Sequence, residues 1–225
     1  FSFHLQPLRQ MLPFSSKLLF TSMFTRINNN IFSVLLGRFY TILQVGFYTQ
    51  GNKWTTMGYS TILGMINNVG QPVFREASED QQRLQNIFHK LLRFIAFVCF
   101  PAMFGLAIVA QELIVLSITD KWLPCVPIMQ ILCVWGAFMP ISTLYSNLMN
   151  SLGRPNIYMW NTIGLGVFQL ICLWFSYSHG LQIMLIIYTT ANILWLLVWQ
   201  YFAHKYAGIL LFDVLKDIAP YLVLS

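Results

Sequence analysis

The sequence predicts an all-α protein that crosses a membrane several times, and three observations carry this prediction. Only 9% of the 225 residues are Asp, Glu, Lys or Arg, whereas a soluble domain has about 25%. Hydrophobic residues make up 57% of the chain and aromatic residues 16%. The apolar residues form long continuous runs rather than the short alternating runs of transmembrane strands. This composition argues against a soluble enzyme, a disordered tail and a coiled coil, because too little charge is present to cover a water-exposed surface.

Six segments are candidates for transmembrane helices, since a helix needs about 20 residues to cross the hydrocarbon core. They are residues 12–36, 44–69, 91–110, 126–149, 157–177 and 183–202. The third, fifth and sixth are long and nearly free of charge, whereas the first two are less apolar. The fourth contains Pro140, which a helical bundle tolerates. We expect a single transmembrane helical bundle over residues 1–225, which includes the start of a seventh span near Ile218.

The two ends of the chain suggest that it is a piece of a longer protein. Residue 1 is Phe rather than Met, and the apolar run that begins near Ile218 stops at Ser225. The longest polar stretch, residues 71–90, is expected to form an aqueous loop with some helix between the second and third spans.

The positions of the basic residues predict the orientation of the bundle. With alternating spans, one side of the membrane receives nine of them and the other side three, with Arg26 set aside. By the positive-inside rule the first side is cytoplasmic. The nine are Arg9, Lys17, Arg75, Arg83, Lys90, Arg93, Arg154, Lys205 and Lys216, and the three are Arg38, Lys53 and Lys121.

The net charge of +6 does not indicate a nucleic-acid partner, because the basic residues are scattered and form no stripe. A metal site is not expected either. The cysteines form no CxxC pair and have no histidine at ligand spacing, so they are interpreted as small apolar packing residues. No cofactor is predicted.

Polar residues follow one face of each of the first two spans. At about 100° per residue, one set in the first span falls within about 40° of one direction and one set in the second within about 60°. The first set is Ser15, Ser22, Arg26, Asn29 and Ser33, flanked by Asn30, and the second is Thr49, Lys53, Thr56, Ser60, Gly64, Asn67 and Gln71. Such stripes must face other helices or a water-filled cavity, because hydrocarbon offers them no hydrogen bonds. The cavity candidates are Ser22, Arg26, Asn29, Asn30 and Ser33 in the first span, and Lys53, Ser60, Asn67 and Gln71 in or beside the second.

Arg26 is the most informative of these residues because it lies near the centre of a span, where an arginine costs about 2.5–3.5 kcal/mol on insertion scales. None of the seven acids lies centrally in a span. An anionic ligand is therefore one interpretation, since guanidinium pairs with phosphate in a bidentate way. The alternative is structural, with Arg26 paired to an acid elsewhere in a longer chain or to carbonyls at a helix end. Lys53 is also open to a second interpretation, as an anchor at the membrane interface.

Several short motifs resemble one known family. They are LGRF and QVGFY at residues 36–39 and 44–48, PVF at 72–74, DKWLP at 120–124 and LGRP at 152–155. Their order and spacing resemble the lipid-linked oligosaccharide flippases of the multidrug/oligosaccharidyl-lipid/polysaccharide exporter superfamily, which are Wzx-like and close to the colanic-acid exporter type. The likeness extends over nearly the whole chain, roughly residues 13–206.

This resemblance implies the C-terminal half of an inner-membrane protein with two helical bundles around a cationic cavity. Its substrate would be an undecaprenyl-pyrophosphate-linked sugar unit, with Arg26 as the candidate for the pyrophosphate. The partners would be the lipid bilayer and the missing N-terminal bundle of the same chain, and the mechanism would be alternating access.

Two other interpretations stay open. A drug or cation exporter of the same superfamily would favour carboxylates in the cavity. A membrane-embedded glycan-modifying enzyme would need acids or histidines in a reactive cluster at the interface. A non-catalytic membrane scaffold would not need two full-length polar stripes.

Overall fold

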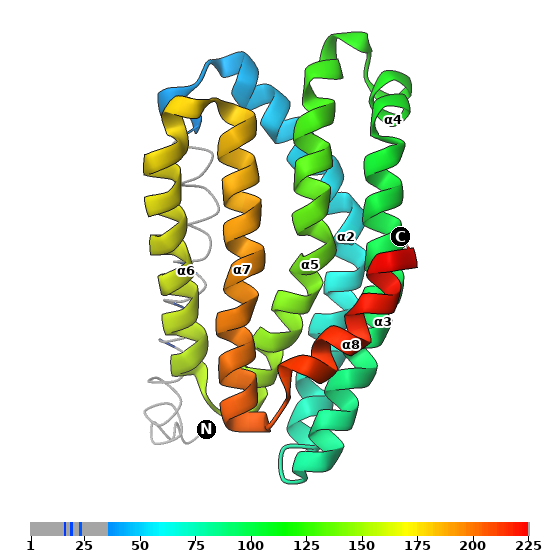
Figure 1. Cartoon of the computed structure of the whole chain (residues 1–225), viewed down its shortest axis with the longest axis vertical. Coiled ribbons are helices and arrows are strands. Elements are labelled where there is room, and N and C mark those ends of the chain that lie inside the picture. The colour runs from blue at the N-terminus through cyan, green and yellow to red at the C-terminus, as the bar shows by residue number, and fades with distance from the viewer. Residues whose placement is uncertain (1–15, 17–18, 20–22, 24–35, 225) are drawn as a thin grey trace, which may run out of the picture.

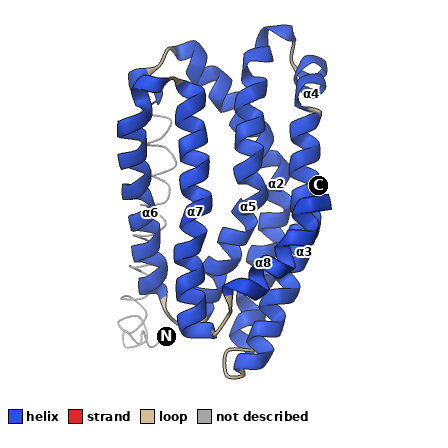
Figure 2. Ribbon diagram, in the orientation of Figure 1, coloured by secondary structure: helices blue, strands red, loops and turns tan. Residues whose placement is uncertain are grey.

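The computed structural model describes residues 16, 19, 23 and 36–224, and every regular element within that part is helical (Figures 1 and 2). The all-α class is confirmed. The elements are α2 (Ile42–Glu76), α3 (Gln81–Ile108), α4 (Ala110–Ser117), η1 (Asp120–Cys125), α5 (Val126–Ser151), α6 (Pro155–Ser176), η2 (Tyr177–His179), α7 (Leu181–Ala207) and α8 (Leu211–Leu224).

Four helical stretches are long and apolar enough to cross a membrane, which supports a multi-pass membrane protein. They are Gln81–Ile108, Asp120–Ser151, Pro155–His179 and Leu181–Ala207, and they overlap four of the six predicted spans. The helix α2 overlaps a fifth, residues 44–69, but is more polar and is not among the four. The remaining predicted span, 12–36, lies outside the described residues except at 16, 19, 23 and 36.

The helix α5 is the centre of the described bundle. It packs against α2, α3 and α7, while α6 packs on α7 at the edge of the bundle (Figure 1). Aromatic side chains fill the space between α2, α3 and α5, where Phe88 stacks on Phe74 and lies 5.2 Å from the ring of Tyr145. All three of these side chains are buried. This packing leaves α6 and α7 on the opposite side of α5 from α3.

Two predicted boundaries are wrong. The stretch 71–90 is not a long loop, because α2 continues to Glu76 and α3 begins at Gln81. The reason is a strong helix start, since the carboxylate of Asp80 accepts hydrogen bonds from the backbone N–H groups of Gln82 and Arg83, both at 3.0 Å. The last helix begins at Leu211 rather than near Ile218.

The connection between α7 and α8 is fixed by α3. Gly208 ends α7 with φ +69°, a left-handed conformation that glycine adopts without strain. The side-chain amides of Gln81 and Gln85 donate to the carbonyl of Ala207 at 3.3 and 2.8 Å. These bonds satisfy a carbonyl at the end of α7 that has no partner within its own helix.

At the other end of the bundle, the segment before α2 is tied to the α6–α7 connection. The hydroxyl of Tyr40 donates to the carbonyl of Tyr177 at 2.9 Å, and Phe39 packs on the Tyr177 ring with 4.9 Å between centroids. Partial burial raises the pKa of Tyr40, which favours the protonated hydroxyl that donates this bond.

Candidate functional site

A polar cleft of about 410 Å³ lies among α2, α5, α6 and α7. Its volume falls within the range of roughly 300–1,000 Å³ that is typical of small-molecule sites. Amides, hydroxyls and aromatic rings dominate its lining, and none of the described lining residues is Asp, Glu, Lys, Arg or His. The lining residues are Leu63, Asn67, Gln71, Trp135, Met139, Ser142, Thr143, Ser146, Asn147, Asn150, Tyr158, Thr162, Leu165, Gln169, Tyr188, Asn192 and Trp199.

One wall of the cleft is held together by Asn147, a residue of α5 that is 4% exposed. Its side-chain NH₂ donates to the carbonyl of Ile66 at 3.3 Å and to Oδ1 of Asn67 at 3.2 Å. Its Oδ1 accepts from Nε2 of Gln71 at 3.2 Å. Close approach is possible here because Gly70 leaves room for the Asn147 side chain. One amide therefore joins α5 to two successive turns of α2.

The opposite wall has a matching amide bridge between α6 and α7. Nε2 of Gln169 donates to Oδ1 of Asn192 at 2.8 Å, and Nδ2 of Asn192 donates to the carbonyl of Tyr188 at 2.7 Å. Gln169 and Asn192 are both buried. In hydrocarbon an unpaired amide would be costly, so these pairs fix how α6 lies on α7.

Hydroxyl groups supply much of the remaining polar surface of the cleft. Thr143, Ser146 and Thr162 donate to carbonyls one turn earlier in their own helices, at 3.2, 3.0 and 2.8 Å. Each oxygen keeps lone pairs that can accept a further hydrogen bond. Oδ1 of Asn150 is buried and has no hydrogen-bond partner within the described part of the chain. A ligand that donates hydrogen bonds would satisfy these acceptors.

A comparison with family models identifies the group to which this chain belongs. The model described as "Polysaccharide biosynthesis protein" matches residues 1–127, more than half of the chain. The chain belongs to the polysaccharide biosynthesis protein family.

Curated relatives of this polysaccharide biosynthesis protein agree with that assignment. It is 29% identical over 153 residues to "Uncharacterized membrane protein in cps region" of Klebsiella pneumoniae. It is 26% identical over 155 residues to the lipopolysaccharide biosynthesis protein WzxC of Escherichia coli, and 24% identical over 163 residues to the teichuronic acid biosynthesis protein TuaB of Bacillus subtilis. The match to WzxC confirms the predicted resemblance to Wzx-like proteins.

The chain spans about one third of the length of these relatives. The alignments cover 68%, 69% and 72% of this chain, but only 32%, 32% and 34% of the proteins from K. pneumoniae, E. coli and B. subtilis. No solved structure matches the chain significantly.

The predicted site residues fall into three groups. Asn67 and Gln71 line the cleft and bond to Asn147. Lys53 and Ser60 are exposed on α2, and the cleft does not include them. The others, Ser22, Arg26, Asn29, Asn30 and Ser33, lie outside the described residues.

Sequence reasoning missed the cleft residues on α5, α6 and α7. On α5 the missed residues lie at helical spacing, at Ser142, Thr143, Ser146, Asn147 and Asn150, whereas the polar residues of α6 and α7 are sparser. A signal was nevertheless present, because Asn147, Gln169 and Asn192 lie within or beside predicted spans, where a polar side chain needs a partner.

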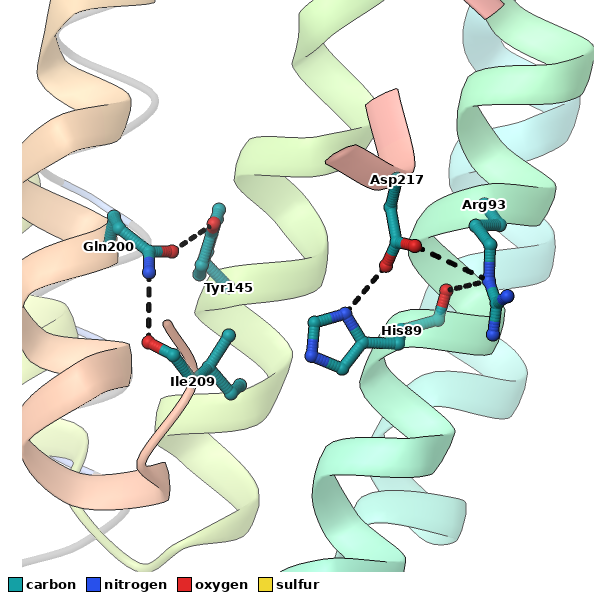
Figure 3. A network of polar contacts seen from close by, with 6 residues as sticks. All are labelled: His89, Arg93, Tyr145, Gln200, Ile209 and Asp217. Carbon is teal, nitrogen blue, oxygen red and sulfur yellow. Dashed lines mark hydrogen bonds and ion pairs between the residues drawn. The ribbon is translucent and has the colours of Figure 1, made fainter. Parts of the chain in front are cut away.

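A second polar cluster joins α3 to α8, away from the cleft (Figure 3). Nδ1 of His89 lies 2.6 Å from Oδ2 of Asp217, and Nε of Arg93 lies 3.7 Å from Oδ1 of the same carboxylate. The side chains of His89 and Asp217 are 19% and 17% exposed. The His89 ring therefore contacts a largely buried carboxylate instead of standing free in solvent. Among the described residues, no group of three His, Cys, Asp or Glu is placed to hold a metal ion.

Proposed function

We propose that this chain is part of a transporter that moves a lipid-linked oligosaccharide across the bacterial inner membrane. The substrate is an undecaprenyl-pyrophosphate sugar unit, and the direction is from the cytoplasmic to the periplasmic leaflet, for surface polysaccharide biosynthesis. The observation that carries the proposal is the polar cleft among α2, α5, α6 and α7, in a chain whose helices are otherwise apolar.

The cleft meets the main energetic demand of such transport. A sugar hydroxyl that enters hydrocarbon without a hydrogen bond costs about 2–7 kcal/mol, so a bare oligosaccharide does not cross a bilayer. A wall of amides and hydroxyls replaces the hydrogen bonds that the sugar makes to water. The polyprenyl chain is apolar, needs no hydrogen-bonding groups and stays in the lipid.

Family membership supports the substrate class. The relatives are named for lipopolysaccharide and teichuronic acid biosynthesis, and both products are polysaccharides of the cell surface. Because the chain spans about one third of each relative, we propose that a further helical bundle of the same protein completes the cavity. The two bundles rock about it in alternating access.

The distribution of basic residues supports the proposed orientation. The connections α2–α3, α5–α6 and α7–α8 lie at one end of the bundle (Figure 1). Arg75, Arg83, Arg154 and Lys205 belong to these connections or to the helix ends beside them. We assign this end to the cytoplasm by the positive-inside rule. In the same proposal Arg26 binds the pyrophosphate, and Asn29, Asn30, Ser22 and Ser33 extend the polar wall.

The proposal is tested with the full-length protein in cells that lack their own flippase. Surface polysaccharide is scored for the wild type, Arg26→Lys and Arg26→Ala at matched protein levels, with Arg75→Ala as a control at an exposed arginine. We expect Arg26→Ala to abolish export, Arg26→Lys to retain part of it, and Arg75→Ala to export normally. Normal export by Arg26→Ala would remove Arg26 from the site. Failure of the wild type to restore export would count against the transporter itself.

A further inference from the structure

We infer that the cleft among α2, α5, α6 and α7 is a subsite for uncharged sugar, and that the diphosphate of the lipid carrier binds outside it. This inference rests on the proposed function and makes it more specific. The sugar would be recognised by neutral polar and aromatic side chains in the cleft, and the diphosphate by positive charge elsewhere in the protein.

The first argument is charge. A diphosphate is an anion that proteins hold with Arg, Lys, metal ions or arrays of backbone N–H groups. None of the described residues that line the cleft carries a formal charge. The walls of the cleft are helices whose backbone N–H groups are bonded within the helix, so they offer no such array. An anion placed here would lose its hydration without gaining a counter-charge from any of the described lining residues.

The second argument is the balance of donors and acceptors. Asn147 donates both hydrogens of its amide to acceptors on α2. The hydroxyls of Thr143, Ser146 and Thr162 donate their hydrogens to carbonyls of their own helices. The buried Oδ1 of Asn150 and the lone pairs of the three hydroxyls remain as acceptors. The cleft therefore offers these acceptors beside the indole N–H donors of Trp135 and Trp199, a mixture that suits sugar hydroxyls, which both donate and accept. Sugar hydroxyls donate, whereas the oxygens of an ionised diphosphate only accept.

The third argument is the aromatic lining. Trp135, Tyr158 and Trp199 contribute rings to the cleft from α5, α6 and α7. Rings of this kind offer rigid apolar surface beside polar groups. A sugar ring has the same combination, with C–H groups on its faces and hydroxyls around its edge. The lining is thus complementary to a pyranose on both its apolar and its polar sides.

The test compares two probes with the full-length protein in lipid nanodiscs. One probe is undecaprenyl-diphosphate-linked N-acetylglucosamine, and the other is undecaprenyl diphosphate without sugar. Dissociation constants are measured for the wild type, Ser146→Ala, Asn150→Leu and Asn150→Asp. The matched control is Ser151→Ala, because Ser151 also lies on α5 and donates to its own helix, at 2.8 Å to Leu148, but does not line the cleft.

We expect Ser146→Ala and Asn150→Leu to weaken binding of the sugar-linked probe by on the order of 3- to 10-fold, which is the range for one lost hydrogen bond. Binding of the sugar-free probe stays unchanged in both variants. Asn150→Asp still offers an acceptor to a hydroxyl, so it binds the sugar-linked probe within about threefold of the wild type. Ser151→Ala binds both probes as the wild type does.

Two results would overturn the inference while leaving the proposed function intact. One is a loss of more than about tenfold for the sugar-free probe in Asn150→Asp, because that result places the anion in the cleft. The other is a wild-type dissociation constant for both probes in every variant, because the cleft then contacts no sugar. If the wild type binds neither probe, the proposed function itself fails.

Discussion

The hydroxyl of Tyr145 on α5 donates a 2.6 Å hydrogen bond to Oε1 of Gln200 on α7, and Nε2 of Gln200 donates at 2.9 Å to the carbonyl of Ile209 (Figure 3). The side chains of Tyr145 and Gln200 are 2% and 5% exposed. One buried glutamine thus connects the central helix, the last long helix and the turn that leads to α8.

Removal of the Tyr145 hydroxyl is expected to destabilise the bundle. Tyr145→Phe keeps the ring and its packing but leaves Oε1 of Gln200 buried without a donor, which costs about 1–2 kcal/mol. The midpoint of thermal unfolding of the full-length protein in detergent should fall. Tyr201→Phe is the control, because this tyrosine is 59% exposed on the same helix as Gln200. Equal midpoints for the two variants would contradict a stabilising role for the bond.

Gly136 on α5 lies close to side chains of α2 and α3, and an added methyl group there is expected to be harmful. A Cβ at this position would lie 2.5 Å from the Met103 methyl group and 3.1 Å from carbons of Thr55 and Tyr59. The end of Met103 can move, but the two α2 side chains cannot both retreat without a shift of α2. Gly136→Ala should therefore cost about 1–3 kcal/mol.

The control for this substitution is Gly105→Ala in α3, where a Cβ meets nothing within 4 Å. Alanine has the higher helix propensity, so this variant should be neutral or more stable by up to about 1 kcal/mol. Chemical denaturation in the same detergent measures both. A Gly136→Ala protein as stable as Gly105→Ala would mean that α2 and α5 are less closely packed than described.

The carboxylate of Asp217 is expected to hold α8 on α3. Asp217→Asn removes the negative charge that faces His89 at 2.6 Å and Arg93 at 3.7 Å. His89 and Asp217 are largely buried, whereas Arg93 is half exposed, so the loss of the His89 contact in particular should allow α8 to open more often. Hydrogen exchange of backbone amides in residues 211–224 should become faster. Lys216→Gln also changes one charge, but at an exposed side chain of the same helix, and should leave that exchange unchanged. Equal protection of α8 in both variants would mean that apolar packing alone holds it.

The long apolar helices were predictable because a membrane leaves little choice of structure. A run of about 20 apolar residues must form a helix in lipid, so α3, α5, α6 and α7 follow from hydropathy. Helix ends were harder. The polar stretch 71–90 suggested a loop after the second span, yet α2 contains Pro72 and continues to Glu76. The start of α3 was visible in principle, since Asp80 stands where a helix cap is expected.

The cleft was predicted only on its α2 side. Asn67 and Gln71 belong to a stripe that the helical periodicity predicted, whereas the polar residues around Asn147 on α5, which also recur at helical spacing, and Asn192 on α7 were not predicted. Their partners lie on other helices, 80 residues away for the pair of Asn147 with Asn67 and 23 residues away for Asn192 with Gln169. Periodicity within one helix carries no information about such pairs, because they depend on how the helices pack.

The amide of Asn147 is expected to be required for both stability and transport. Asn147→Leu has a similar volume but loses the three hydrogen bonds that join α5 to Ile66, Asn67 and Gln71. The carbonyl of Ile66 remains bonded within α2, so the main cost comes from the two α2 side chains, at about 1–2 kcal/mol. The α2–α5 wall of the cleft should then loosen, and export of surface polysaccharide in flippase-deficient cells should fall by about 5- to 30-fold, the factor that corresponds to that energy.

Asn156→Leu separates this effect from the general consequence of replacing an asparagine by leucine. Asn156 is exposed on α6 and does not line the cleft, so this variant should export at the wild-type rate. Protein levels in the membrane are compared for both variants, because a misfolded protein would be degraded. If Asn147→Leu reaches wild-type levels and exports normally, the amide cluster is not part of the transport path. If it reaches those levels and exports poorly, the geometry of the α2–α5 wall is needed for transport itself and not merely for folding.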